Sequence, residues 1–365
     1  MPALFLHMGA GKTGTSALQV AFAQNSKELE KAGVLYPADA STDDAGLGKI
    51  TSGNGLTLAR YVNPDSSVLN QIQLIGGQRA FDRALKTQQH LLYSSEFFQN
   101  FKLQPLQALV ERAAKSEYQT KIIFYIRSIA GHAASVYSQT IKRQKSDMSF
   151  MEFLEKRYKN HFLQFIERAT EVVDRKNLLI YNFDAVRTNI FAHFLQEALS
   201  IGADKGNFIY PKSINRSLSP FEMEFMRYLN ARFEKRYQSA FVSDALIYAH
   251  SEVSSEFTIT PAEMAFLRTQ YAQTVDALNE YVIGEKIQLC DSSITEAERP
   301  EINLSEFERS VLSIMAKLVP TRPAFADFGP IKNANGLAQS FLSMLRRRGL
   351  KAVRRAKDQK RLGRD

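Results

Sequence analysis

Hydrophobic residues gather in short runs along the first half of the chain, and each run is followed by a stretch with helical periodicity. The runs are rich in Ile, Leu and Phe and end in polar or glycine-rich residues. Runs of this length suit strands buried on both faces, and their alternation with helices favours a parallel sheet. The clearest runs are residues 3–9 (ALFLHMG), 90–96 (HLLYSSE), 121–127 (KIIFYIR) and 177–183 (NLLIYNF).

The pattern changes after about residue 217, where strand-like runs largely stop. Residues 220–237 and 261–282 read as amphipathic helices, each beginning at a proline, where the missing N–H is least harmful. We therefore predict an α/β fold with a central parallel sheet flanked by helices and a helical C-terminal region. Its domain should span residues 1–285 and be helical from about 218, followed by an irregular extension at 286–340 and a basic helix or tail at 341–365.

Composition places the chain among ordinary globular proteins, with 44% hydrophobic and 23% charged residues in 365. The single cysteine, Cys290, excludes an intrachain disulfide framework. No stretch approaches the ~20 apolar residues that span a bilayer. Residues 1–11 lack the basic region of a signal peptide. We expect a soluble, cytoplasmic protein.

The net charge of +9 is concentrated at one end of the chain. Residues 346–365 hold ten of the 47 basic residues and two of the 38 acidic ones, which leaves the rest nearly neutral. Such a tail could bind an anionic membrane surface or an acidic polymer, or it could be a solvated terminal helix. Peripheral contact with the inner membrane face is thus an option, while nucleic acid is not an expected partner.

The stretch LHMGAGKTGTSALQ, residues 6–19, follows the first apolar run. The strict phosphate-loop spacing needs a glycine at position 6, where this chain has Leu6. A lysine and free N–H groups at a helix start would still attract an anion. A glycine turn with a capping Thr or Ser is the structural alternative. The candidate anion ligands are Gly11, Lys12, Thr13, Gly14, Thr15 and Ser16.

A kinase-like enzyme would also hold Mg²⁺, usually with an Asp that ends a neighbouring strand. Two of the apolar runs lead instead to Glu96 and Arg127, whereas the run at 177–183 is followed by Asp184. The six histidines and Cys290 show no metal-ligand spacing, so no metal is expected. An enzyme using ATP and Mg²⁺ stays as an alternative.

Lys12-Thr13-Gly14-Thr15-Ser16, placed after a first strand, resembles the loop of sulfotransferases that use 3′-phosphoadenosine 5′-phosphosulfate (PAPS), in the bacterial, carbohydrate-type branch of that family. The following helix pair and the segment 33–37 (GVLYP) are also similar to it. The resemblance covers roughly residues 3–285 and is patchy between 38 and 85. It implies an α/β fold of the P-loop type with three layers, in which the loop holds the 5′-phosphosulfate of PAPS as co-substrate. Relatives often have Pro where this chain has Gly11.

The resemblance also implies a site for the 3′-phosphate of PAPS. The family uses an Arg that ends a strand and a Ser eight residues later, which here are Arg127 and Ser135. Their charged fork and hydroxyl suit a phosphate. Asn215 and Ser217 are possible donor contacts by the same resemblance, although Ser217 or Ser219 could instead cap a helix.

By analogy with phosphoryl transfer, the reacting centre needs a cation at the leaving oxygen and a base for the acceptor hydroxyl. Lys12 is the candidate cation. Glu96 is the candidate base, because the family places its base after this strand, although Glu96 could also cap a helix. Ser94 and Ser95 could support it. His7 and His132 could touch a substrate, but core histidines are the more common outcome at such positions.

The acceptor is the least readable partner. The glycine- and asparagine-rich segment 42–67 lies where the family varies, and variable loops commonly set specificity. The resemblance implies a hydroxyl of a glycan or of a lipid-linked sugar. A non-catalytic relative that binds an anionic polymer through the tail is the remaining alternative. The oligomeric state is not predicted.

Overall fold

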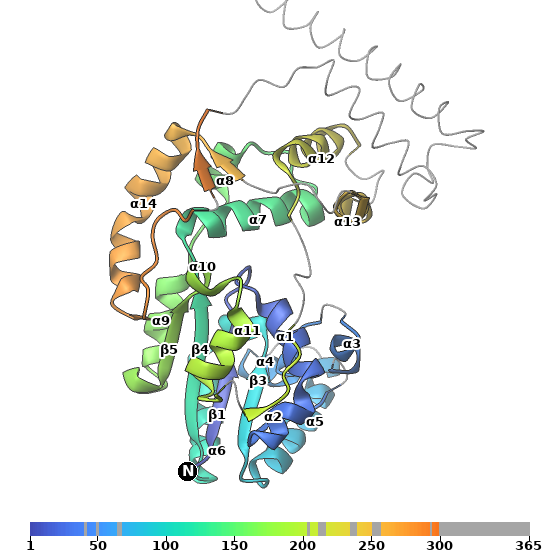
Figure 1. Cartoon of the computed structure of the whole chain (residues 1–365), viewed down its shortest axis with the longest axis vertical. Helices are drawn as coiled ribbons and strands as arrows, with labels where there is room; N and C mark the ends of the chain where they lie inside the picture. Colours follow the sequence, from blue (N-terminus) through green and yellow to red (C-terminus); the bar gives the residue numbers. More distant parts are fainter. Residues whose placement is uncertain are drawn as a thin grey trace, which may run out of the picture. The chain divides into compact units, whose positions relative to one another are not determined.

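The computed structural model describes residues 1–39, 42–48, 51–63, 68–202, 205–210, 217–233, 239–249, 257–292 and 294–298. The chain divides into two compact units, coloured by sequence in Figure 1. The first comprises Met1–Val136, Leu154–Ile214 and Ala262–Ile294. The second comprises Tyr137–Phe153, Asn215–Pro261 and Thr295–Asp365.

Three predictions fall outside the described residues. They concern the basic tail at 341–365, the possible donor contact at Asn215, and most of the irregular extension at 286–340. Of that extension, the structure describes residues 286–292 and 294–298.

The first unit is built on one six-stranded sheet with the order β2-β3-β1-β4-β5-β7. Every recorded neighbour pair in it is parallel. β1 is central, since Leu4 is in register with Leu91 of β3 and with Thr120 of β4. The strands are β1 (Ala3–His7), β2 (Val34–Leu35), β3 (His90–Ser94), β4 (Gln119–Ile126), β5 (Leu178–Asn182) and β7 (Val282–Ile283).

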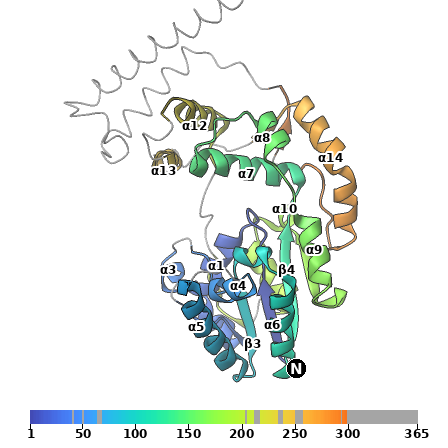
Figure 2. The same ribbon diagram turned by 180° about the vertical axis from the view of Figure 1, so that it is seen from behind.

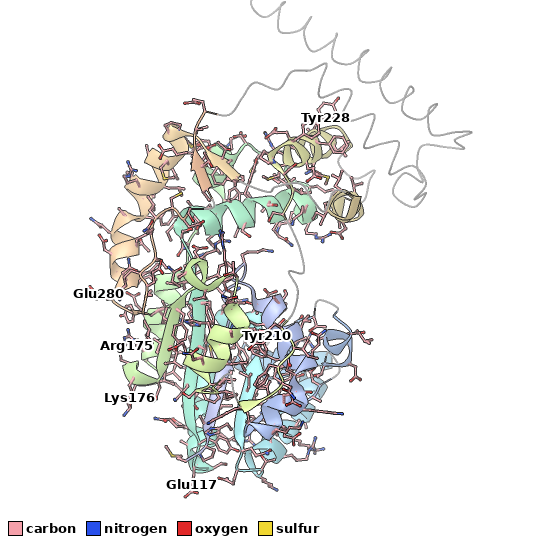
Figure 3. All side chains as sticks on the ribbon, in the orientation of Figure 1. Glu117, Arg175, Lys176, Tyr210, Tyr228 and Glu280 are labelled. Carbon is pink, nitrogen blue, oxygen red and sulfur yellow. The ribbon has the colours of Figure 1, made fainter. Side chains whose placement is uncertain are left out.

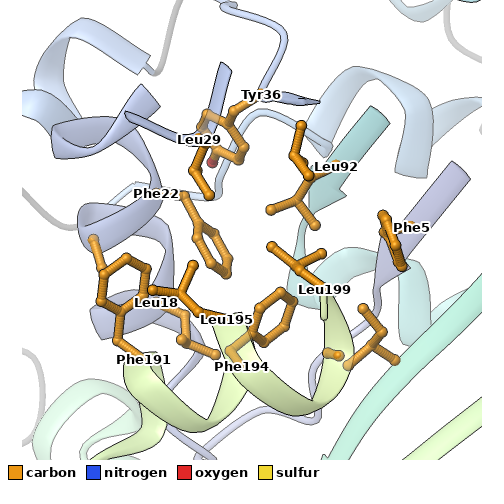
Figure 4. Packing of buried hydrophobic residues seen from close by; sticks show 14 of the residues in the cluster. Phe5, Leu18, Phe22, Leu29, Tyr36, Leu92, Phe191, Phe194, Leu195 and Leu199 are labelled. Carbon is orange, nitrogen blue, oxygen red and sulfur yellow. The ribbon is translucent and has the colours of Figure 1, made fainter. Parts of the chain in front are cut away.

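Helices from the beginning and the middle of the chain cover one face of this sheet. They are α1 (Thr15–Gln24), α2 (Ser26–Lys31), α11 (Ile190–His193) and η3 (Phe194–Ala198). Phe22 of α1 is fully buried, with its ring centroid 4.8 Å from that of Phe194 and 5.7 Å from that of Tyr36. Figure 4 shows these rings packed with Leu18 and Leu195. Burying side chains of this size contributes about 1.5–3 kcal/mol each.

The opposite face is covered by α6 (Leu103–Lys115) and α9 (Phe162–Thr170). Figure 2 shows α6 in front of the sheet, beside β4. The ring of Phe124 in β4 stacks on Phe165 of α9, with centroids 4.1 Å apart. In α6, Leu106, Leu109 and Ala113 are buried, which is the spacing of one helix face.

The first unit contains further helical elements. They include α3 (Thr42–Gly46), α4 (Leu56–Val62), α5 (Val68–Leu85), η1 (Glu96–Asn100), the start of α7 (Ile129–Gln144), η2 (Arg175–Asn177), α10 (Phe183–Val186) and α14 (Pro261–Asn279). Arg175 donates to the carbonyl oxygens of Glu280 and Tyr281, at 3.2 and 2.8 Å. These bonds connect η2 to the chain just before β7; Figure 3 labels Arg175 and Glu280.

The second unit has a small core of its own. It contains the end of α7, the start of α8 (Phe150–Lys156), α12 (Pro220–Phe233), α13 (Ser239–Ala249), and the pair β6 (Phe257–Ile259) and β8 (Ile294–Glu296). The rings of Tyr137 and Phe257 lie 5.1 and 4.9 Å from that of Phe150. The Asn230 amide donates to the carbonyls of Ile141 and Ser146.

The predicted fold class is confirmed: a parallel sheet lies between helical layers, and the four apolar runs are β1, β3, β4 and β5. The helix predicted at 261–282 is partly wrong, because α14 ends at Asn279 and Val282 begins β7. A two-residue edge strand has too few positions to show a period of its own.

Candidate active site

The candidate residues gather at the carboxyl edge of the sheet. Ligands of open parallel sheets bind where connections leave adjacent strands in opposite directions. The chain leaves β1 towards β2, and leaves β4 towards β5, so the reversal lies between β1 and β4. Lys12 follows β1 and Arg127 follows β4, while Glu96 follows β3 on the other side of β1.

The loop after β1 is held by its own hydroxyls. The Thr13 and Thr15 hydroxyls, both buried, donate to the Ala10 carbonyl oxygen at 2.7 and 2.9 Å. Each hydroxyl has a single proton, so these two side chains stabilise the turn and have no proton left to donate to an anion. The remaining polar side chains of the loop are those of Lys12 and Ser16. Lys12 is exposed and has φ 67°, and Ser16 is half-buried.

Gly14 and Gly11 allow close contacts around this loop. Gly14 has φ 76°, and a Cβ there would lie 2.9 Å from the ring of Phe183. A side chain would therefore be strained in two ways at this position. The Gly11 N–H donates to Oε1 of Gln99 in η1 at 3.4 Å. The loop is thus in contact with η1, the element that contains Glu96.

Glu96 lies directly against the loop. A Cβ on Gly9 would be 3.7 Å from Cα of Glu96, and a Cβ on Gly11 would be 4.0 Å from its Oε2. Glu96 is half-buried and is the first residue of η1. The Phe97 N–H at the start of η1 donates to Ser95 Oγ at 3.3 Å. Because Ser95 is the cap, the carboxylate of Glu96 is not needed for that role.

His7 is part of the core and not of a binding surface. It is fully buried, its Nδ1 lies 2.8 Å from Ser94 Oγ, and its ring lies edge-on to Phe22 and Phe194. Burial lowers the pKa of His7 to about 3. The His7–Ser94 bond joins the carboxyl ends of β1 and β3, so both residues support the strand ends that precede Lys12 and Glu96.

This buried histidine predicts a loss of stability in acid. At a pH below about 6.5, the ordinary pKa of histidine, His7 is protonated in the unfolded chain but stays neutral in the folded protein. Lowering the pH therefore favours the unfolded state. From pH 7 to pH 5 the wild type should lose about 2 kcal/mol more unfolding free energy than His7→Phe. Urea unfolding of both proteins at the two pH values measures this. An equal loss in both proteins would show that His7 accepts a proton in the folded state.

Arg127 is held by two carboxylates. Its Nη2 lies 3.1 Å from Asp184 Oδ1 and 3.5 Å from Asp291 Oδ2, and its guanidinium lies over the ring of Phe183. Asp184 also accepts the Ser128 N–H at 2.7 Å, and the Ser128 hydroxyl donates to Asp291. These side chains are about 10% exposed. Arg127 therefore follows β4 directly, and it already has anionic partners.

Arg127, Asp184 and Asp291 together carry a net negative charge, because one guanidinium faces two carboxylates. Lys12 is not counted in this balance. Burial raises the pKa of Asp184, whereas Arg127 and the Ser128 N–H oppose that rise. Sequence reasoning missed Asp291, which follows β7 in an irregular segment. The only signal was an acidic residue after a short apolar stretch, which is too common to single out.

His132 and Ser135 lie one turn apart on the same face of α7, and both are half-buried. The Tyr158 hydroxyl donates to the Ile129 carbonyl oxygen at 3.2 Å and lies 3.0 Å from His132 Nδ1. Its single proton is then committed, which assigns Nδ1 of His132 as a donor. Burial, followed by the charges of Arg127 and Lys12, lowers the pKa of His132 to about 3. The imidazole of His132 is therefore neutral at pH 7.

The alternative role predicted for Ser217 or Ser219, a helix cap, can be compared with the structure. Ser219 and Glu222 form a reciprocal capping box at the start of α12, with N–H bonds of 2.8 and 3.2 Å, and Ser217 is exposed two residues earlier.

Among the described residues, no group of three or more His, Cys, Asp or Glu is arranged to hold a metal. Nor does any helix of the described part have the length and apolar character to cross a membrane.

Comparison with known proteins gives remote similarities. No protein-family profile and no curated protein matches the chain. A sulfotransferase from Alicyclobacillus acidocaldarius has a similar structure, at 15% identity over 63% of this chain and 92% of that one, with a TM-score of 0.36. The sulfotransferase domain from the curacin biosynthetic pathway is similar at 12% identity over 74% and 98%, with a TM-score of 0.31. Values this low leave the function to be judged from the chain's own residues.

Proposed function

We propose that the protein is a PAPS-dependent sulfotransferase that moves a sulfuryl group to a hydroxyl of a glycan or lipid-linked sugar. The observation that carries this proposal is the contact between Glu96 and the Lys12 loop, with Glu96 Oε2 4.0 Å from the Cβ position of Gly11. A cation and a carboxylate at adjacent strand ends suit a transfer that needs both a leaving-group cation and a base.

The donor would lie along the reversal point between β1 and β4. Lys12, Ser16 and the N–H groups at the start of α1 would hold the 5′-phosphosulfate, because a helix N-terminus favours anions. Arg127 and Ser135, on the β4 side, would hold the 3′-phosphate. The bonds from Thr13 and Thr15 to Ala10 support this arrangement by fixing the turn.

The reaction uses both groups. Glu96 accepts the proton of the acceptor hydroxyl while the acceptor oxygen forms a bond to sulfur. The bond between sulfur and the 5′-phosphate oxygen breaks, and Lys12 stabilises the charge that develops on that oxygen. The products are the sulfate ester, 3′-phosphoadenosine 5′-phosphate (PAP) and the proton held by Glu96.

A kinase-like reaction has less support from this site. The Asp that could hold Mg²⁺, Asp184, is paired with Arg127 and with the Ser128 N–H. Transfer of labelled sulfate from PAPS to a panel of oligosaccharides and glycolipids, measured with and without EDTA, tests the proposal. We expect label in at least one acceptor class and no effect of EDTA. Phosphate transfer from ATP and Mg²⁺, with none of sulfate, would overturn it.

Asp291 should weaken donor binding, since its carboxylate shares Arg127 with the incoming 3′-phosphate. Asp291→Asn keeps the shape and removes the charge. We expect PAP to bind about tenfold more tightly, which corresponds to ~1.4 kcal/mol of relieved repulsion. Calorimetric titration measures it. Asp244→Asn, at an aspartate paired with Arg143, is the control and should leave PAP binding unchanged. Weaker or equal PAP binding by Asp291→Asn would contradict the placement of the 3′-phosphate.

A further inference from the structure

Among the described residues, the carboxyl end of β3 lacks a full strand neighbour on its outer side. β2 pairs with β3 only at Val34–His90 and Leu35–Leu91. Beyond that point, the backbone of Leu92 to Ser94 has no β2 residue opposite it. This is the stretch that leads into Glu96, so its hydrogen-bond partners determine where the carboxylate lies.

Asn54 takes the place of the missing strand. Its Nδ2 donates to the carbonyl oxygens of Leu92 and Pro37, both at 3.0 Å, and its Oδ1 accepts the Ser94 N–H at 2.9 Å. The Gly55 N–H adds a bond to the Ser94 carbonyl oxygen at 3.0 Å. An amide side chain offers a donor and an acceptor as a peptide group does, so it can continue the ladder. Asn54 is 3% exposed.

The two glycines beside Asn54 make this approach possible. Gly53 has φ 76°, and a Cβ there would overlap the Ser94 carbonyl oxygen. A Cβ on Gly55 would lie 2.7 Å from the ring of Phe98 and 3.0 Å from Ser94. Only glycine lets the backbone approach β3 this closely at both positions. The Gly53-Asn54-Gly55 segment can therefore lie directly against the carboxyl end of β3.

The other side of the same strand end is also fixed. The Ser95 N–H donates to the His7 carbonyl oxygen at 3.0 Å, and Ser95 caps η1. Glu96 follows immediately, with its Cα 3.7 Å from the Cβ position of Gly9 in the loop. A shift of the β3 end therefore moves the Glu96 carboxylate relative to the Lys12 loop.

We infer that Asn54 is a positioning residue for Glu96, which it holds in register with the Lys12 loop. This inference rests on the proposed function. Part of the segment 42–67 thus has a structural role: Asn54 is buried against β3, the strand that precedes Glu96, and does not line an acceptor surface. Because a misplacement of about 1 Å can lower a rate by ~10²-fold, removing this amide should act mainly on kcat.

The test compares two buried asparagines with the same bonding pattern. Asn25 is 1% exposed, donates to the Ala21 and Ile209 carbonyls and accepts the Ile209 N–H, but it lies at the far end of α1. We expect Asn54→Ala to lower kcat for sulfuryl transfer about tenfold or more, with KM for PAPS and Kd for PAP within about twofold of wild type. Asn25→Ala should leave kcat within about twofold, although both variants lose hydrogen bonds.

A double variant distinguishes a positioning role of Asn54 from a general structural effect of its removal. If Asn54 acts through Glu96, Asn54→Ala should not slow a protein that already carries Glu96→Gln. Asn54→Ser, which places one hydroxyl where the amide was, should give a smaller loss and serves if the alanine variant does not fold. A wild type that transfers no sulfate would refute the proposed function and this inference together. An active wild type in which Asn54→Ala matches Asn25→Ala in kcat, or adds its effect to Glu96→Gln, would refute the inference alone.

Discussion

Lys12→Met should lower kcat for sulfuryl transfer by about 10²-fold to 10³-fold, the range seen when one group that stabilises developing charge is removed. Methionine keeps the length of the side chain and removes the ammonium. The Thr13 and Thr15 bonds to Ala10 do not involve the Lys12 side chain, so the turn should persist. Single-turnover measurement with PAPS and an identified acceptor follows the chemical step directly.

The control for this variant is Lys176→Met. Lys176 is 74% exposed in η2, at the amino end of β5, and Figure 3 shows it on the part of the first unit that contains Arg175. Its replacement should change kcat by less than about twofold, since surface substitutions rarely matter. A Lys12→Met protein with wild-type kcat and a raised KM would instead mean that Lys12 binds the donor equally in both states.

Glu96→Gln should lower kcat by a similar amount, about 10²-fold to 10³-fold, because a positioned base contributes in this range. The amide has nearly the shape of the carboxylate, so η1 and its Ser95 cap should be retained. KM for PAPS should change little, since the proposed donor site is formed by the Lys12 loop and Arg127 and does not include Glu96. Steady-state kinetics with PAPS and the acceptor varied in turn separates the two effects.

Glu117→Gln is the matched control for the base. Glu117 is exposed in the turn before β4, at the opposite edge of the sheet. It should keep wild-type kcat. An unchanged kcat in Glu96→Gln would remove Glu96 from the reaction, even if the protein still transferred sulfate from PAPS.

The four central strands could be predicted from the sequence because each is a run of consecutive apolar residues buried on both faces. Parallel strands place their carboxyl ends on one edge, so the sequence alone was enough to expect Lys12, Glu96 and Arg127 near one another. β2 and β7 could not be predicted, because two residues each are too few for a pattern.

Asn54 and Asp291 depend on tertiary contacts that local sequence does not encode. Asp291 meets Arg127 across 164 positions of chain and lies in an irregular segment. Asn54 lies in Gly-Asn-Gly, which is typical of a turn, and only the short β2 makes its amide a replacement for a strand. The hydroxyl roles of Thr13 and Thr15 likewise depend on where the Ala10 carbonyl points.

We propose that this sheet edge binds a nucleotide with both a 5′- and a 3′-phosphate group. The most direct test is thermal unfolding with PAP, compared with ADP and Mg²⁺. We expect PAP at ~100 times its Kd to add about 2.7 kcal/mol to the unfolding free energy, and ADP with Mg²⁺ to add little. Stabilisation by ADP and Mg²⁺, with none by PAP, would contradict it.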